Sequence, residues 1–322
     1  KQIGDSNVAK DTNHRSFKGS NMTFDYYALG SSNVLRLDLD DVGADGHYYD
    51  IDITGSSNIV EIDTHTSDDV QDTHLDLDIN GNDRDDIIFG TDDGNLYLIY
   101  DNGDIGFVVS VDDDIRSAPS IVNMNGELLI LVGSRDDNLY GINQDGSIRF
   151  IKHTGSKVDS SPMFIEYNSS LHIYFGSSDG YLYGIDSNGN DLSGWPVLIG
   201  NAIESSPSSA DFNGDDIPEI VVSTEANDLH IYQIDGNAYT TIPIVFEFPF
   251  SGNPCIIDID QDQDLEIFIG STNSMMAVDI KDINGSAEGY WNHYRGNLYR
   301  QGYFETDVNL YAPDINLFDE FK

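Results

Sequence analysis

Short apolar runs recur along the chain at near-constant spacing, and each follows a polar loop. Residues 87–90, 220–223 and 267–270 are typical, with Ile, Val and Phe before a closing Gly or Ser. Runs of this length are too short for helices, and their β-branched and aromatic content predicts buried strands. Their last residues, separated by 43, 43, 47 and 47 positions, are Gly90, Gly133, Gly176, Ser223 and Gly270. A repeat of ~40–50 residues is typical of the four-stranded blade of a β-propeller.

Other motifs keep the phase of these runs. A predicted first strand opens at a Pro-containing tripeptide, at residues 117–119, 160–162, 205–207 and 252–254. A predicted third strand opens at a Tyr-containing motif, at residues 95–97, 138–140, 181–183 and 228–232. We therefore expect an all-β chain, a β-propeller of four-stranded blades. Six units fit the count best, or seven if the N-terminal 33 residues build a blade of their own.

The two ends of the chain are expected to meet. Residues 14–27 and 291–303 share a loosely similar aromatic and basic make-up, and an open sheet edge would invite association. The N- and C-terminal segments should therefore pair and close the ring. The resulting organisation is an N-terminal segment over residues 1–33 that contributes to closure, a propeller over 34–305, and a tail or linker over 306–322.

Three of the polar loops have the spacing of a metal site. Each is nine residues long and carries oxygen-bearing side chains at positions 1, 3, 5 and 9, while position 7 can offer a backbone carbonyl. Alternate residues of a tight loop can all turn inward, and hard cations such as Ca²⁺ take six to eight oxygen ligands. The candidate metal ligands are Asp78, Asn80, Asn82, Arg84 and Asp86; Asp211, Asn213, Asp215, Ile217 and Glu219; and Asp258, Asp260, Asp262, Asp264 and Glu266.

The continuation of these loops differs from that of an EF-hand. An EF-hand closes with Glu at position 12 and runs into a helix, whereas here the closing carboxylate is at position 9 and a strand follows. We predict three Ca²⁺ ions held at hairpin tips. A fourth would lie where an insertion stretches the same pattern, at Asp38, Asp40, Asp45 and Asp50.

Composition narrows the range of partners. The chain carries 57 acidic and 15 basic residues, a formal charge of −42, and no basic patch. Such a field repels nucleic acid and anionic membranes, so we expect no nucleic-acid partner. No apolar stretch approaches the ~18 residues needed to cross a bilayer, so we expect no membrane insertion. Cys255 is the only cysteine, so no intramolecular disulfide can form. In an extracellular protein, bound metal would then provide the stabilisation that disulfides usually provide.

The loops and the strands after them resemble the FG-GAP or VCBS-type repeat propellers, which include the integrin α-subunit head. The matching residues are the three Asp-rich loops, the pairs Phe89-Gly90 and Phe175-Gly176, and Gly194-Trp195-Pro196, and the resemblance covers residues 34–305. Two units without the acidic loop look more like blades of quinoprotein-like propellers. The resemblance implies calcium within the blades, secretion or surface display, and adhesion or ligand binding. Closing segments like residues 291–303 also occur in secreted bacterial surface modules.

No catalytic constellation stands out from the residue types. The eight histidines form no zinc-ligand spacing, and no Gly-x-Ser-x-Gly elbow is present. Arg116, Asp159, Glu204 and Ser251 each stand three residues before an aligned Pro, so they should face the channel mouth in turn. They would either hold a sugar or peptide side chain or form a self-neutralising ring.

The function predicted from the sequence is a non-enzymatic, calcium-stabilised extracellular propeller, acting as a binding, adhesion or structural surface module. Its partner would be a protein or carbohydrate ligand at a propeller face, further copies of itself, or other modules of a larger surface protein. The alternative is a polysaccharide lyase or hydrolase on a propeller scaffold. A glycan screen for binding and for turnover distinguishes them.

Overall fold

A computed structural model describes residues 78–82, 84–239, 244–245, 250, 252–259, 261–271, 274–281, 285–296 and 302–306 in full, and the backbone of six strands between residues 2 and 63. Every element in these ranges is a β-strand, which confirms the all-β prediction. The same ranges hold no helix long and apolar enough to cross a membrane. The chain forms two compact units, residues 1–118 and 119–322, which are described in turn.

The first unit begins with two parallel sheets. One contains β1 (Gln2–Ile3), β3 (Thr23–Leu29) and β5 (Tyr48–Thr54), and the other contains β2 (Val8–Lys10), β4 (Val34–Asp38) and β6 (Ile59–Asp63). Tyr27 pairs with Gln2 on one side and with Asp52 on the other, so the same register recurs every 25 residues. Consecutive strands alternate between the two sheets, which is the connectivity of a parallel coil.

This parallel pairing differs from the antiparallel blade expected from residue 34 onward. The predicted strands near residues 51–54 and 58–63 exist, but Asp38 and Asp50 lie on strands of different sheets and not at one hairpin tip. Asp40 and Asp45 lie outside the described residues. The sequence contains a signal for the coil: a Gly-x-Ser-Asn motif followed by Val or Ile recurs at residues 4–8, 30–34 and 55–59.

The first unit ends with an antiparallel sheet of β7 (Ile87–Gly90), β8 (Asn95–Ile99) and β9 (Ile105–Ser110). Ile88, Leu96 and Leu98 are fully buried. Phe89 stacks on Tyr97 of the neighbouring strand with ring centroids 5.4 Å apart. The Phe-Gly pair therefore ends a strand whose aromatic ring packs within its own sheet.

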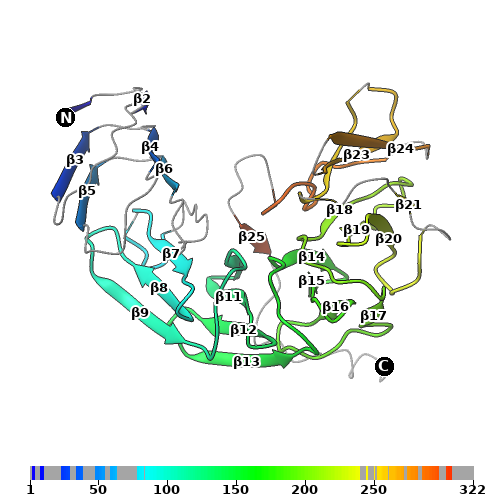
Figure 1. The fold of residues 1–322 in the computed structure, drawn as a ribbon, viewed down its shortest axis with the longest axis horizontal. Helices are drawn as coiled ribbons and strands as arrows, with labels where there is room; N and C mark the ends of the chain where they lie inside the picture. The colour runs from blue at the N-terminus through cyan, green and yellow to red at the C-terminus, as the bar shows by residue number, and fades with distance from the viewer. Residues whose placement is uncertain are drawn as a thin grey trace, which may run out of the picture. The chain divides into compact units, whose positions relative to one another are not determined.

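The second unit is a succession of antiparallel meanders, in chain order as Figure 1 shows. The strands are β10 (Ser120–Met124), β11 (Glu127–Ser134), β12 (Asn138–Asn143) and β13 (Ile148–His153); β14 (Met163–Tyr167), β15 (Ser170–Gly176), β16 (Tyr181–Ile185) and β17 (Val197–Leu198); β18 (Ser208–Ala210), β19 (Glu219–Ser223), β20 (Asp228–Tyr232) and β21 (Ile244–Val245); and β22 (Cys255–Ile257), β23 (Leu265–Gly270) and β24 (Met275–Ile280). The four-stranded sheets confirm the predicted blade unit and its phase.

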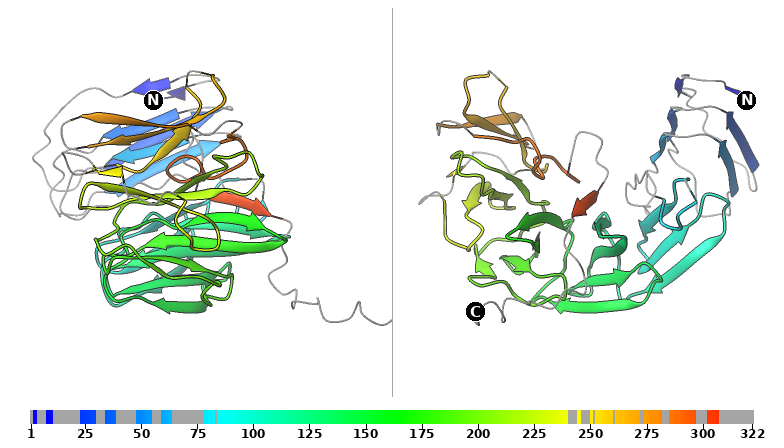
Figure 2. Two further views of the ribbon diagram at one scale, coloured as in Figure 1. Left: turned by 90° about the vertical axis from the view of Figure 1, so that its right-hand side faces the viewer. Right: turned by 180° about the vertical axis from the view of Figure 1, so that it is seen from behind.

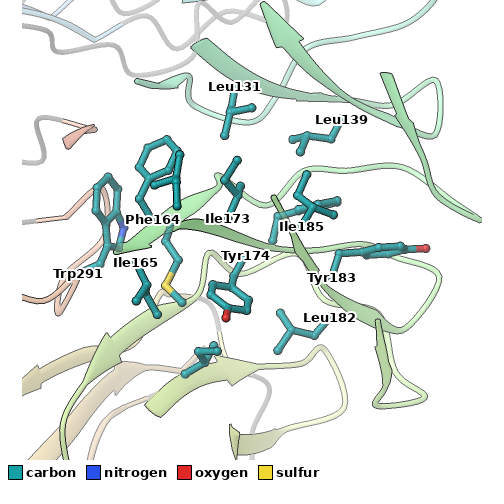
Figure 3. Close-up of a cluster of buried hydrophobic side chains, with 14 of the residues drawn as sticks. Leu131, Leu139, Phe164, Ile165, Ile173, Tyr174, Leu182, Tyr183, Ile185 and Trp291 are labelled. Carbon is teal, nitrogen blue, oxygen red and sulfur yellow. The ribbon is translucent and has the colours of Figure 1, made fainter. Parts of the chain in front are cut away.

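Adjacent meanders of the second unit share one apolar core. Leu131 and Leu139 of the first meander lie near Phe164, Ile173 and other residues of the second, as the side chains of Figure 3 show. A further core cluster joins the third and fourth meanders through residues such as Phe212 and Ile267. Burial at ~25 cal/mol per Å² of apolar surface between neighbouring sheets is the main stabilising contribution of such a stack.

The recurring glycines have a packing reason. A Cβ added at Gly133 would lie 2.5 Å from Val158 Cγ1, and one added at Gly176 would lie 2.1 Å from Ile203 Cγ2. Val158 and Ile203 are fully buried and belong to the connection that leads into the next meander. In these two meanders, a glycine near the end of the second strand therefore leaves room for this connection.

A C-terminal strap, residues 285–296 and 302–306, runs along the first strands of the second unit. Its backbone bonds to the third meander through Ser209 N–H to Trp291 O at 2.8 Å, and to the fourth through Ile256 N–H to Asn292 O at 2.8 Å. Its last strand, β25 (Tyr303–Thr306), pairs in parallel with β10 of the first meander. Figure 2 shows β25, in red, beside the green strands of that sheet.

The strap changes the expected closure. Sequence similarity suggested that residues 291–303 would meet the N-terminal segment, whereas β25 pairs with β10 and Thr23–Leu29 pairs with β1 and β5. Within the described ranges no strand pairs the two ends and no sheet closes on itself. The described residues hold five antiparallel meanders, whereas the first unit counted from the sequence has parallel strands whose register recurs every 25 residues.

Candidate functional site

The three acidic loops occupy equivalent places in their sheets. We name residues 78–86 loop 1, residues 211–219 loop 2 and residues 258–266 loop 3. Loop 2 joins β18 to β19, loop 3 joins β22 to β23, and loop 1 leads into β7. The hairpin register brings position 9 opposite the residue before position 1, through the pairs Ala210 with Glu219 and Ile257 with Glu266.

All three loops share one hydrogen-bond frame. The carboxylate at position 9 accepts a bond from the backbone N–H at position 2, at 2.9 Å in loop 1, 2.9 Å in loop 2 and 2.8 Å in loop 3. The carboxylate at position 1 accepts one from the N–H at position 4, with donors Gly81 at 2.6 Å, Gly214 at 2.7 Å and Gln261 at 2.6 Å. Position 4 has positive φ in every loop, which glycine adopts without steric cost.

Loop 2 buries two carboxylates together. Asp211 and Glu219 are each 2% exposed, and Phe212, which follows Asp211 in the sequence, is fully buried. Burial raises the pKa of Glu219 to about 7, and the charges of Asp215 and Asp211 add to the rise. Asn213 donates its side-chain amide to Glu219 at 3.2 Å. The carboxylates at positions 1, 5 and 9 thus repel one another, and the amide at position 3 donates a hydrogen bond to position 9.

Loop 3 brings its acids closest. Asp262, Asp264 and Glu266 each place a carboxylate oxygen within 4.8 Å of the others, and no other such group of three occurs among the described residues. Lys281 lies against this group, with Nζ 2.9 Å from Asp264 Oδ2 and 3.4 Å from Asp262 Oδ2. Asp258 is at the expected place, and Asp260 lies outside the described residues.

Loop 1 has fewer carboxylates at its candidate ligand positions, only Asp78 and Asp86. Asp86 is fully buried, and burial raises its pKa although the backbone N–H groups of Asp101, Ile79 and Asn80 oppose the rise. Asn82 and Arg84 both bond to Asp101, at 2.7 and 2.9 Å. The Arg84 side chain is directed to a carboxylate outside the loop, which leaves only its backbone carbonyl for a metal.

The donor chemistry of the loops fits a hard cation. Every candidate ligand atom is an oxygen, and the ligand positions alternate along a hairpin tip, as Ca²⁺ sites require. Burying carboxylates side by side is costly unless they are protonated or meet a cation. The raised pKa of Glu219 expresses that cost.

The sequence of this region is recognisable. Residues 211–269 match the family model of FG-GAP-like repeats. The match begins at position 1 of loop 2 and ends within β23, so the FG-GAP-like repeat contains loops 2 and 3 and the strands between them. A search of curated proteins found no match to the chain.

Part of the chain is similar to solved structures. Two crystal structures of BBS1N in complex with ARL6DN, one soaked with mercury and one with lead, are similar to 69% and 68% of this chain. The sequence identities are 13% and 12%, and both TM-scores are 0.47. The chain spans 66% and 64% of the length of those chains.

The predicted face residues are engaged in ion pairs. In the first unit, Arg116 contacts Asp92 at 2.9 Å and Asp114 at 3.2 Å. In the second, Asp159 and Glu204 are bridged by Lys157, whose Nζ is 2.7 Å from Asp159 and 2.6 Å from Glu204. Ser251 lies outside the described residues.

A repeated pairing that the sequence analysis missed underlies these contacts. The residue two positions after each strand-ending glycine bonds to the predicted face residue, in the pairs Asp92 with Arg116, Arg135 with Asp159, and Ser178 with Glu204. The separations of 24, 24 and 26 positions were the signal that could have found it. We call the pairs in the second unit, with Lys157, the polar ladder.

Within the polar ladder, the negative charge of Asp159 is balanced by Arg135 and Lys157. Burial opposes ionisation of this carboxyl, but hydrogen bonds from Arg135 and Lys157 outweigh it and hold the pKa below its usual range. His153, which stands near these residues in sequence, is exposed and contacts Asn138 at 2.6 Å. The ladder therefore links successive meanders. His153 contacts Asn138, whereas Asp159 contacts Arg135 and Lys157.

Replacing Asp159 with Asn is expected to lower the free energy of unfolding at neutral pH by ~2 kcal/mol, because the charge-assisted bonds from Arg135 and Lys157 are lost. The folded-state pKa is lowered, so the stabilisation is complete above the ordinary value of ~3.9 and disappears as the pH falls through the folded value. Urea unfolding at several pH values measures this difference. Glu288→Gln, at an exposed side chain, is the control, and an Asp159→Asn effect no larger than that of the control would contradict the ladder's role.

Proposed function

We propose that the chain is a non-enzymatic, calcium-stabilised repeat module of β-propeller type, which works outside the cell in binding, adhesion or surface structure. The observation that carries the proposal is the common frame of the three loops. In each, the backbone N–H of position 4 holds the carboxylate at position 1, and the N–H of position 2 holds the carboxylate at position 9. The FG-GAP-like repeat supports the proposal because it contains two of these loops.

The chain's own residues would hold the ion as follows. Position 1 is fixed by the N–H at position 4 and position 9 by the N–H at position 2, so both carboxylates are oriented before metal arrives. Side chains at positions 3 and 5 would complete an oxygen cage, with the backbone carbonyl at position 7 and, in loop 3, the side chain of Asp264 at that position. Bound calcium would supply positive charge that removes repulsion among the carboxylates.

The chain would work in an extracellular medium and bind a ligand at one face. A formal charge of −42 and a single cysteine suit a medium rich in salt and divalent ions, in which metal takes the role of disulfides. A protein or carbohydrate ligand would bind at the face that carries the polar ladder. Binding of a glycan without turnover supports a module, whereas new reducing ends or unsaturated products would contradict the non-enzymatic assignment.

Thermal unfolding with and without calcium tests the stabilising role. A ligand that binds only the folded state adds RT ln(1 + [Ca²⁺]/Kd), which is ~2.7 kcal/mol per site at a hundredfold excess over Kd. We expect the melting temperature to rise in millimolar calcium and to fall on adding EGTA. Equal melting temperatures in calcium and EGTA, with magnesium as the control ion, would contradict the proposal.

A further inference from the structure

Loop 3 contains a positive charge of its own. Lys281 Nζ lies 2.7 Å from Asp279 Oδ2 as well as 2.9 Å from Asp264 Oδ2 and 3.4 Å from Asp262 Oδ2. Asp262 and Asp264 belong to the group of three carboxylates, whereas Asp279 lies outside the loop. The ammonium group thus bridges the candidate metal site and a carboxylate beside it.

The hairpin places Lys281 there by its register. Leu265 pairs with Ile280 and Glu266 pairs with Asp279, so residue 281 follows β24 at the end of the hairpin that carries loop 3. Asp264 is 4% exposed, and its Oδ1 atom is buried without a hydrogen-bond partner among the described residues. A buried carboxylate oxygen of this kind is costly unless another ligand, such as a cation, reaches it.

The other two loops provide the contrast. In loop 1 the cationic side chain Arg84 is paired with Asp101 outside the loop, at 2.9 Å. In loop 2 none of the ion pairs of the described chain involves Asp211, Asp215 or Glu219. Lys281 therefore contacts carboxylates of its own loop, whereas Arg84 contacts a carboxylate outside its loop.

We propose that Lys281 is a tethered competitor of calcium: it neutralises loop 3 when no metal is bound, and moves fully onto Asp279 when metal enters. This inference rests on the proposed function. An ammonium and a divalent cation repel each other at such distances, so a metal on Asp262 and Asp264 disfavours the Lys281 ammonium there. The Lys281 side chain is 63% exposed, which leaves it free to move.

Two consequences distinguish loop 3 from loop 2. Metal binding at loop 3 must break the contacts of Lys281 with Asp264 and Asp262, so its affinity is lowered. The repulsion among the carboxylates of the metal-free loop 3 is also smaller, because Lys281 already compensates part of their negative charge. Loop 3 would thus respond to changes in calcium concentration, while loop 2 would stay loaded.

Calcium titration calorimetry on the full chain tests the inference with Lys281→Met. We expect calcium to bind loop 3 roughly fivefold more tightly in this variant, since the exposed ion pairs of Lys281 with the loop no longer have to be broken. The same substitution in a Glu266→Gln background, in which loop 3 is disabled, should leave the remaining affinities unchanged. Lys281→Gln checks that the effect comes from the lost charge and not from the Met side chain.

Asp279→Asn completes the test as a double-mutant cycle. It should weaken calcium binding at loop 3 in the natural background and have a smaller effect beside Lys281→Met, because its role acts through Lys281. Unchanged affinity in Lys281→Met, in a protein that binds calcium, would overturn the tethered competitor and leave the calcium module standing. A chain that binds no calcium at any loop would overturn both.

Discussion

Replacing Trp291 with alanine is expected to lower the free energy of unfolding by ~3–5 kcal/mol, the range for large aromatic side chains in a core. Trp291 is 4% exposed and meets the ring of Phe164 edge-on, with centroids 5.4 Å apart (Figure 3). It also contacts Phe304 of β25, at 6.4 Å between centroids. The variant therefore leaves a cavity and loosens the strap that joins several meanders.

Chemical denaturation of the full chain measures this loss. Met275→Ala is the matched control, because it also truncates a large apolar side chain but at a site that is 75% exposed. A surface change of this kind is expected to cost less than ~0.5 kcal/mol. If Trp291→Ala were as mild as Met275→Ala, the strap would not be part of the core of the second unit.

Glu219→Gln should separate the calcium role of loop 2 from its folding role. In saturating calcium the variant is expected to lose ~2.7 kcal/mol, the contribution of one site at a hundredfold excess over Kd. In EGTA above neutral pH it should be as stable as the natural chain or more so. The raised pKa of about 7 means that the folded state holds the Glu219 proton more tightly, so ionisation at higher pH destabilises the metal-free fold.

Asp216→Asn is the control for this variant, since it removes one charge from an exposed position of the same loop that is not a candidate ligand. Thermal and urea unfolding in both media measure the difference. The assignment of Glu219 fails if its replacement costs the same in EGTA as in calcium, because that result indicates a purely structural hydrogen bond to Phe212.

The loops could be predicted because their information is local. Nine consecutive residues contain the candidate ligand positions and the turn at Gly81 or Gly214, and the strand follows directly. Burial and charge compensation could not be predicted in the same way. Lys281 lies 17 positions from Asp264, and its contact depends on the register of β23 and β24.

Other features depended on pairings over longer distances. The polar ladder joins residues such as Arg135 and Asp159 across a whole hairpin, so alignment of single positions found only one member of each pair. The parallel coil at the N-terminus was assigned to a blade because its strands have the length and composition of blade strands. The coil differs from a blade in its 25-residue period, which is shorter than the 43–47 residues that separate the blade markers.

Equilibrium dialysis of the EGTA-treated chain against calcium, followed by metal analysis, tests the central claim most directly. The account predicts one calcium ion for each of loops 1, 2 and 3, with one ion lost in Glu219→Gln and none lost in Asp216→Asn. Magnesium at the same concentration should not replace calcium, because it requires a smaller and more rigid octahedral site. Failure to retain any calcium at millimolar concentration would contradict the account.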